Sequence, residues 1–129
     1  MLTRRLFLAA AVAGLTLAAS AHAMEAKPFD PAAFQAAQAA GKPILVEVTA
    51  PWCPVCRAQK PILSDLKRRP EFASLVVFEV DFDSRKDVLR TMNVQKQSTL
   101  ITFKGKSETG RSTGDTNAAS IEALLKRAL

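Results

Sequence analysis

The chain reads ILVEVTAPWCPVCR from Ile44 to Arg57. Residues 44–48 form a run of aliphatic and β-branched side chains interrupted by one acid, which is typical of a short strand covered on both faces. Two cysteines follow this run, Cys53 and Cys56, with two residues between them. We therefore expect a central strand that ends in a cysteine-bearing turn at the start of a helix.

A Cys-x-x-Cys pair at the beginning of a helix has a specific chemistry. The free N–H groups and the dipole at that end of a helix stabilise the thiolate of the first cysteine. Cys53 is thus predicted to attack a substrate disulfide, and Cys56, expected to be the more buried of the two, to resolve the mixed disulfide. A static structural disulfide is the alternative, but so small a loop contributes little entropic stabilisation.

Residues 56–69 predict an amphipathic helix, which Pro61 is expected to kink. Its apolar face is expected to consist of Ala58, Ile62, Leu63 and Leu66. The basic residues on the helix are expected to form an ordinary solvated surface: Lys60, Lys67, Arg68 and Arg69.

The remaining elements alternate between helix and strand. We expect an irregular segment or edge strand over 24–29, followed by a helix capped by Asp30 and begun by Pro31. A strand over 75–82 and a helix capped by Ser84 that runs to about Met92 come next. The chain is then expected to form a hairpin of 100–103 with 108–112 and a last helix opened by 115–117. This order predicts an α/β fold with a mixed sheet flanked by helices on both faces.

Residues 1–23 have the pattern of an export signal. They comprise a positive start at Arg4 and Arg5, an apolar run over 6–19, and the small-x-small pattern Ala21-His22-Ala23. Cleavage is predicted after Ala23, which leaves 24–129 as one domain, and the paired arginines resemble the twin-arginine export motif. General secretion is the other route. An uncleaved anchor is an alternative, although the apolar run is shorter than the ~20 residues of a spanning helix.

Composition excludes several classes of site. The single histidine, His22, lies in the predicted signal, so a mature chain has no Ser/His/Asp or Cys/His catalytic group and no histidine ligand for a metal. Two cysteines supply half of a zinc site, so neither a metal nor a cofactor is expected. The formal charge of +6 is not gathered into a basic block with interleaved aromatics, so no nucleic acid is expected as a partner.

With these residues the mature chain resembles the thioredoxin family. The resemblance lies at Ile44–Glu47, Ala50–Arg57, Pro61–Leu63, Val80–Asp83, Thr99–Gly105 and Gly114. It implies a thioredoxin fold and thiol–disulfide exchange with protein substrates that carry disulfides or dithiols. It also implies a substrate-binding surface around the sulfurs, made by Trp52, Pro54, Val55, Ser98 and Thr99.

Two of these residues have alternative interpretations. In the family, an acid at the place of Glu47 lies behind the second cysteine and exchanges its proton, so Glu47 is a predicted acid–base group for Cys56; the alternative is that it reaches solvent at the sheet edge. Trp52 would shield the sulfurs; the alternative is plain core packing.

Ser98 departs from the family, which has a cis-proline there. A non-proline cis bond costs ~3 kcal/mol, so the serine is either held cis by the fold or the loop relaxes to trans. In the family, loss of that proline can permit metal or iron–sulfur capture between two chains, which is one alternative function.

The leading functional hypothesis is a periplasmic reductant that is kept reduced by a membrane electron-transfer partner. The lack of a histidine between Cys53 and Cys56 favours a reductant, because strongly oxidising members of the family often use one there. A disulfide-forming oxidase would use the same pair in the opposite direction, and a scaffold would use the fold without turnover.

Overall fold

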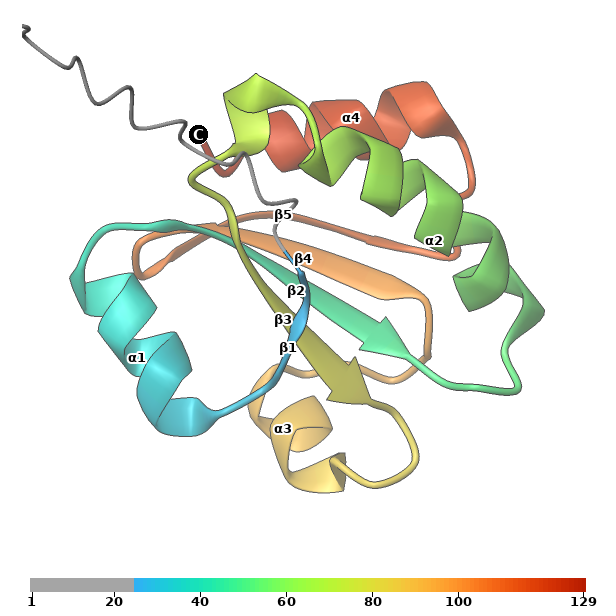
Figure 1. Cartoon of the computed structure of the whole chain (residues 1–129). Helices are drawn as coiled ribbons and strands as arrows, with labels where there is room; N and C mark the ends of the chain where they lie inside the picture. The colour runs from blue at the N-terminus through green and yellow to red at the C-terminus, as the bar shows by residue number, and fades with distance from the viewer. Residues whose placement is uncertain (1–24) are drawn as a thin grey trace, which may run out of the picture.

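The computed structural model describes residues 25–129, so the predicted export signal and its cleavage site lie outside the described part. The chain forms a five-stranded sheet with helices on both faces (Figure 1). The elements are β1 Lys27–Pro28, α1 Pro31–Ala39, β2 Pro43–Thr49, α2 Pro54–Lys67, the 3-10 turn η1 Pro70–Phe72, β3 Val76–Asp81, α3 Lys86–Thr91, β4 Thr99–Lys104, β5 Ser107–Thr113 and α4 Ala118–Lys126. No helix within 25–129 is long and apolar enough to cross a membrane.

The sheet is mixed, as the order of elements predicts. Its strand order is β1-β3-β2-β4-β5, with β2 in the middle. β2 runs parallel to β3 and antiparallel to β4, and β4 and β5 form the predicted hairpin. The cysteine-bearing turn therefore follows the central strand of the sheet. Because β3 and β4 pair with this strand on its two sides, the start of the turn is held in place.

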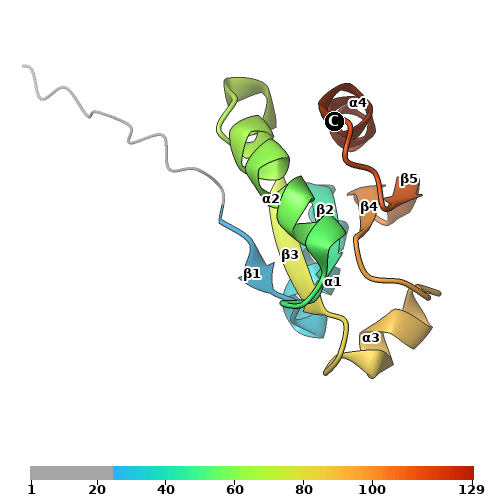
Figure 2. The same cartoon turned by 90° about the vertical axis from the view of Figure 1, so that its right-hand side faces the viewer.

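Alternation along β2 divides the core into two layers. Ile44, Val46 and Val48 face the layer shared with α1 and α3, whereas Leu45 faces the layer shared with α2 and α4. Figures 1 and 2 show these two helix pairs on opposite faces of the sheet. Because successive strand residues point to opposite faces, a strand buried on both sides must be apolar throughout, and this is why Glu47 stands out.

Three local expectations have clear outcomes. Asp30 caps α1 as predicted, and its carboxylate accepts from the N–H of Ala33 at 2.9 Å. Ser84 does not cap α3, which begins two residues later; its N–H and hydroxyl instead donate to Asp81, at 2.9 and 3.1 Å. The Ser84 side chain is thus directed at the carboxylate at the end of β3 and not at the first turn of α3.

The apolar face of α2 is also rotated from the expected one. Ala58 is exposed, and the side chain buried in its stead is Gln59, in line with Cys56, Leu63 and Leu66. A polar side chain on the buried face of a helix needs hydrogen-bond partners, and those of Gln59 lie in the site described next.

Candidate active site

Cys53 and Cys56 bridge the first turn of α2 as a disulfide. Cys53 is the N-cap residue of the helix, with an extended backbone, and its Sγ accepts from the N–H of Cys56 at 3.1 Å. Pro54 occupies the first helical turn, where its missing N–H costs nothing and its fixed φ suits the helix. The sequence thus places a sulfur where a helix offers free donors, an arrangement that stabilises a thiolate on reduction.

The two sulfurs are enclosed to the same extent in the disulfide state. Cys53 is 1% exposed and Cys56 is 2% exposed, so the expectation that Cys56 is the more buried is wrong for this state. Ala50 and Phe82 pack against the pair and cover it. Reaching the sulfurs therefore requires a partner to lie against the rim of exposed residues around them.

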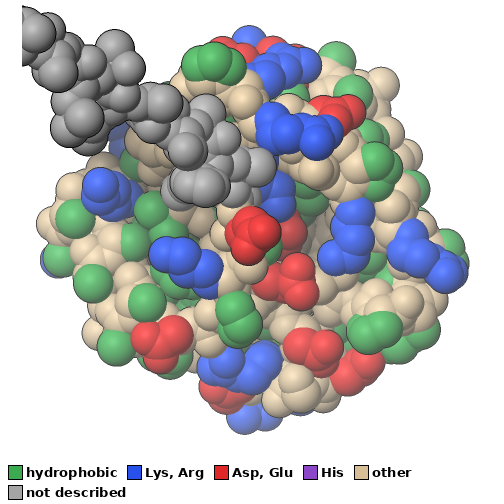
Figure 3. All heavy atoms as spheres, in the orientation of Figure 1, with side chains coloured by type: hydrophobic (Ala, Val, Ile, Leu, Met, Phe, Trp, Pro, Cys, Tyr) green, Lys and Arg blue, Asp and Glu red, His purple; other side chains and the backbone are tan. Residues whose placement is uncertain are grey.

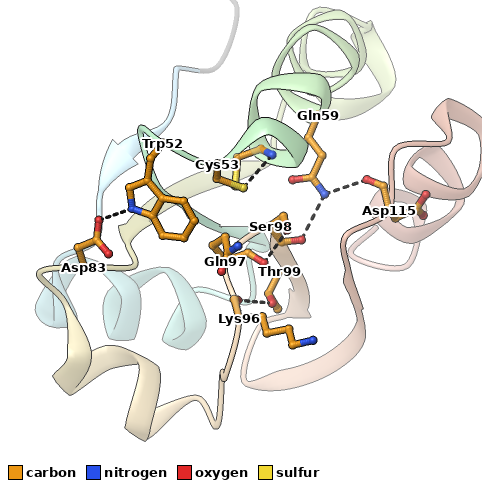
Figure 4. Close-up of a disulfide and its surroundings, with 10 residues drawn as sticks. Trp52, Cys53, Gln59, Asp83, Lys96, Gln97, Ser98, Thr99 and Asp115 are labelled. Carbon is orange, nitrogen blue, oxygen red and sulfur yellow. Dashed lines mark hydrogen bonds between the residues drawn. A yellow bond between two sulfur atoms is a disulfide. The ribbon is translucent and has the colours of Figure 1, made fainter.

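Trp52 and Val55 belong to that rim. Trp52 is 54% exposed and Val55 is 37% exposed, so the alternative that Trp52 is a core residue is wrong. The indole Nε1 donates to Asp83 Oδ2 at 2.8 Å (Figure 4). The ring also meets Phe82 edge-on, with 6.5 Å between the ring centroids. These contacts hold the indole beside the disulfide while leaving much of its face open.

Glu47 is buried, so the alternative that it reaches solvent at the sheet edge is wrong. Its Oε1 accepts from the ammonium of Lys67 at 2.8 Å. Lys67 is the last residue of α2, whereas Cys56 is in the first turn. The acid–base role of Glu47 toward Cys56 stays a prediction. The expectation that Lys67 lies on a solvated surface is wrong, because this lysine pairs with the buried carboxylate.

The other basic residues of the predicted surface, Lys60, Arg68 and Arg69, are exposed as expected. Lys60 is half exposed and lies 3.8 Å from Glu79, and Arg69 pairs with Glu122 at 3.0 Å. On the face drawn in Figure 3, basic and acidic side chains are interspersed. Such exposed pairs contribute little stability individually.

The loop that carries Ser98 lies across from the disulfide (Figure 4). No peptide bond in the described part is cis, so the loop adopts the trans form rather than the cis form. Ser98 compensates with a left-handed backbone, φ 56°, and its hydroxyl donates to the carbonyl of Gln97 at 2.6 Å. Thr99 is buried, and its hydroxyl donates to the carbonyl of Lys96 at 2.7 Å.

Gln59 connects this loop to the cysteine helix. Its Nε2 donates to the carbonyl of Ser98 at 3.2 Å and to that of Asp115 at 2.8 Å. Gln59 is not among the site residues predicted from the sequence, although one signal was present: it follows Cys56 by three residues, which places both on one helix face. The structure therefore brings Cys53, Cys56 and Ser98 together.

The arrangement supports disulfide exchange in a defined order. A thiolate at Cys53 attacks one sulfur of a substrate disulfide and releases the other as a thiolate. The sulfur of Cys56 then displaces the substrate, which restores the Cys53–Cys56 disulfide and leaves the substrate with two thiols. The two electrons gained by the substrate are those lost by the pair.

Comparison with known proteins agrees with this chemistry. The sequence profile of the Thioredoxin family matches residues 25–127. The chain is 35% identical over 81 residues to a thioredoxin H-type of Fagopyrum esculentum, covering 63% of this chain and 68% of that protein. It is 31% identical over 85 residues to putative thioredoxin-5 of Dictyostelium discoideum, covering 66% of this chain and 80% of that protein.

A solved structure extends the agreement to the fold. The crystal structure of Trxlp from Edwardsiella tarda EIB202 superposes with a TM-score of 0.76 at 42% identity, covering 78% of this chain and 98% of that one. The expected fold and the expected class of enzyme are both confirmed. The chain belongs to the thioredoxin family and is a thiol–disulfide oxidoreductase with the exchanging pair Cys53 and Cys56.

Proposed function

We propose that the protein is exported, is cleaved after Ala23, and acts in the periplasm as a reductant of disulfide-containing protein substrates. A membrane electron-transfer partner returns the Cys53–Cys56 disulfide to the dithiol. The proposed direction of electron transfer, from this protein to its substrates, rests on the groups that surround Cys53 Sγ.

Few groups around Cys53 stabilise the thiolate form of its sulfur. It accepts a hydrogen bond from the N–H of Cys56, and the nearest cationic residue in sequence is Arg57, which is exposed. No histidine lies between the cysteines. Stabilising the thiolate of the reduced pair makes the corresponding disulfide a stronger oxidant. Modest stabilisation of the Cys53 thiolate therefore favours a reductant over a disulfide-forming oxidase.

Export is supported by the make-up of residues 1–23 together with the reach of the family match. The match begins at residue 25, one residue after the predicted mature N-terminus at Met24, and β1 begins at Lys27. A charged start, an apolar run and a small-x-small site therefore precede a domain that does not include them.

The reduction potential of the purified mature protein tests the direction of transfer. We expect a value near that of reducing thioredoxins, about −270 mV, whereas a value near about −120 mV would identify an oxidase. Equilibration with dithiothreitol redox buffers, read by the mass of alkylated and unalkylated protein, gives this quantity directly.

Export and recharging are tested in the cell. Mass spectrometry of the periplasmic fraction is expected to find an N-terminus at Met24, and substitution of Arg4 and Arg5 by lysine separates the two export routes.

Acid quenching followed by alkylation is expected to find the periplasmic protein mainly as the dithiol. A fully oxidised pool would contradict the membrane electron-transfer partner.

A further inference from the structure

We propose that Gln59 is a positioning residue for protein substrates. Its side-chain amide fixes the position of the loop from Lys96 to Thr99 beside the disulfide. This position determines how well a protein substrate can contact the exposed residues around the sulfurs.

The position of Gln59 suits this role. The side chain is 3% exposed and projects from the same face of α2 as Cys56, one turn further along. Its two hydrogen bonds reach two separate segments, the Ser98 loop and the connection from β5 to α4 at Asp115 (Figure 4). One amide thus joins the cysteine helix to both segments that flank it.

The Ser98 loop needs such an anchor. A left-handed backbone is unfavourable for a residue with a Cβ, and such a conformation persists only where its surroundings determine it. Two donors fix the carbonyl of Ser98: Gln59 Nε2 at 3.2 Å and the N–H of Gly114 at 3.0 Å. Without the amide, the carbonyl of Ser98 keeps a single donor, the N–H of Gly114 just beyond the end of β5.

The burial of the sulfurs explains why the anchor affects proteins more than small molecules. Cys53 is 1% exposed, so a protein that presents a disulfide to it must also contact the surrounding rim. That rim includes Trp52 on one side and the exposed Lys96 with the half-buried Gln97 on the other. A small disulfide needs only a path to the sulfur, whereas a protein needs the loop in place.

Substitution of Gln59 by methionine tests the proposal, because methionine keeps the length of the side chain and removes both donors. We measure steady-state reduction of insulin and of hydroxyethyl disulfide by the mature protein, with dithiothreitol as the electron source. The loss of two hydrogen bonds predicts about a tenfold lower kcat/KM for insulin, carried by KM, while hydroxyethyl disulfide stays within about twofold.

Leu63→Met is the matched control, because Leu63 lies on the same buried face of α2 and belongs to the apolar cluster between α2 and α4. It is expected to leave both rates unchanged. Amide hydrogen exchange supplies an independent readout: Gln59→Met is expected to speed exchange at Ser98 and at Gly114, and not in β2. Gln59→Asn, which retains the amide but falls short of both carbonyls, is expected to act in the same direction.

Equal losses for insulin and hydroxyethyl disulfide would overturn the proposal, since they would mean that Gln59 only supports the fold. Unchanged insulin kinetics in a folded Gln59→Met protein would overturn it as well. If that variant does not fold, the Gln59→Asn comparison and the exchange at Gly114 decide in the same way.

Discussion

The ammonium of Lys67 donates to Oε1 of Glu47 at 2.8 Å, and both side chains are nearly closed off from water, with 12% and 8% of their surfaces exposed. The pair joins the last turn of α2 to the central strand. An unpaired carboxylate at this depth would be strongly unfavourable, so the lysine explains how an acid is tolerated within β2.

Lys67→Met is expected to destabilise the protein strongly. Removal of one member of a buried ion pair leaves the other charge unpaired, at a cost of roughly 3–5 kcal/mol. Urea denaturation of the reduced and oxidised forms measures this loss.

The double variant Glu47→Gln with Lys67→Met is the control. It leaves no buried charge, so we expect it to recover most of the stability that Lys67→Met loses. A loss below about 1 kcal/mol in Lys67→Met would show that the pair is screened by water, as exposed pairs are.

Substitutions at Ser98 are expected to rank by their tolerance of φ 56°. Ser98→Gly should be more stable than Ser98→Ala by about 1 kcal/mol, because a left-handed backbone disfavours a Cβ. Ser98→Pro should be the least stable of the three, because proline fixes φ near −65° and the loop must rearrange. Thermal denaturation ranks them; a proline variant as stable as the alanine one would contradict the ranking.

Asp81 is expected to contribute to the acid sensitivity of the fold. The N–H of Ser84, first among several donors that include the Ser84 hydroxyl and the N–H of Asp83, holds the pKa of Asp81 below its usual value. Because this pKa is lower in the folded chain than in the unfolded chain, the bonds add stability above the unfolded value, about pH 4, and that stability is lost as the pH falls through the folded value.

Asp81→Asn tests this dependence. The variant is expected to be less stable than the parent at pH 7, and the difference should shrink as the pH falls from about 4 toward 2. Urea midpoints measured across this range provide the comparison, with Asp65→Asn as an exposed control on α2. A difference that stays constant with pH would mean that ionisation of Asp81 plays no part.

Much of the fold could be predicted because its signals are local. The apolar run of β2, the cap at Asp30 and the hairpin around Gly105 each depend on neighbours in sequence, and each is confirmed. The cap predicted at Ser84 is wrong because the Ser84 hydroxyl donates to Asp81, three residues earlier, and does not accept an N–H from the first turn of α3.

The site was predictable only in part. Cys53 and Cys56 are recognisable from spacing and from the strand before them. The contacts of Lys67 and Gln59 join residues that are distant in sequence, 20 residues apart for Lys67 and Glu47 and 39 for Gln59 and Ser98. Such partners depend on how α2 lies over the sheet, which periodicity does not determine. The backbone of Ser98 likewise depends on donors from α2 and Gly114.

The central claim is that Cys53 attacks and Cys56 resolves, and trapping of the mixed disulfide tests it most directly. Reduced Cys56→Ser is incubated with a small disulfide and digested, and the adduct is located by mass spectrometry. We predict a stable adduct on Cys53 in this variant, and little or none on Cys56 in the matched Cys53→Ser variant. Equal adducts in both variants, or none in either, would contradict the account.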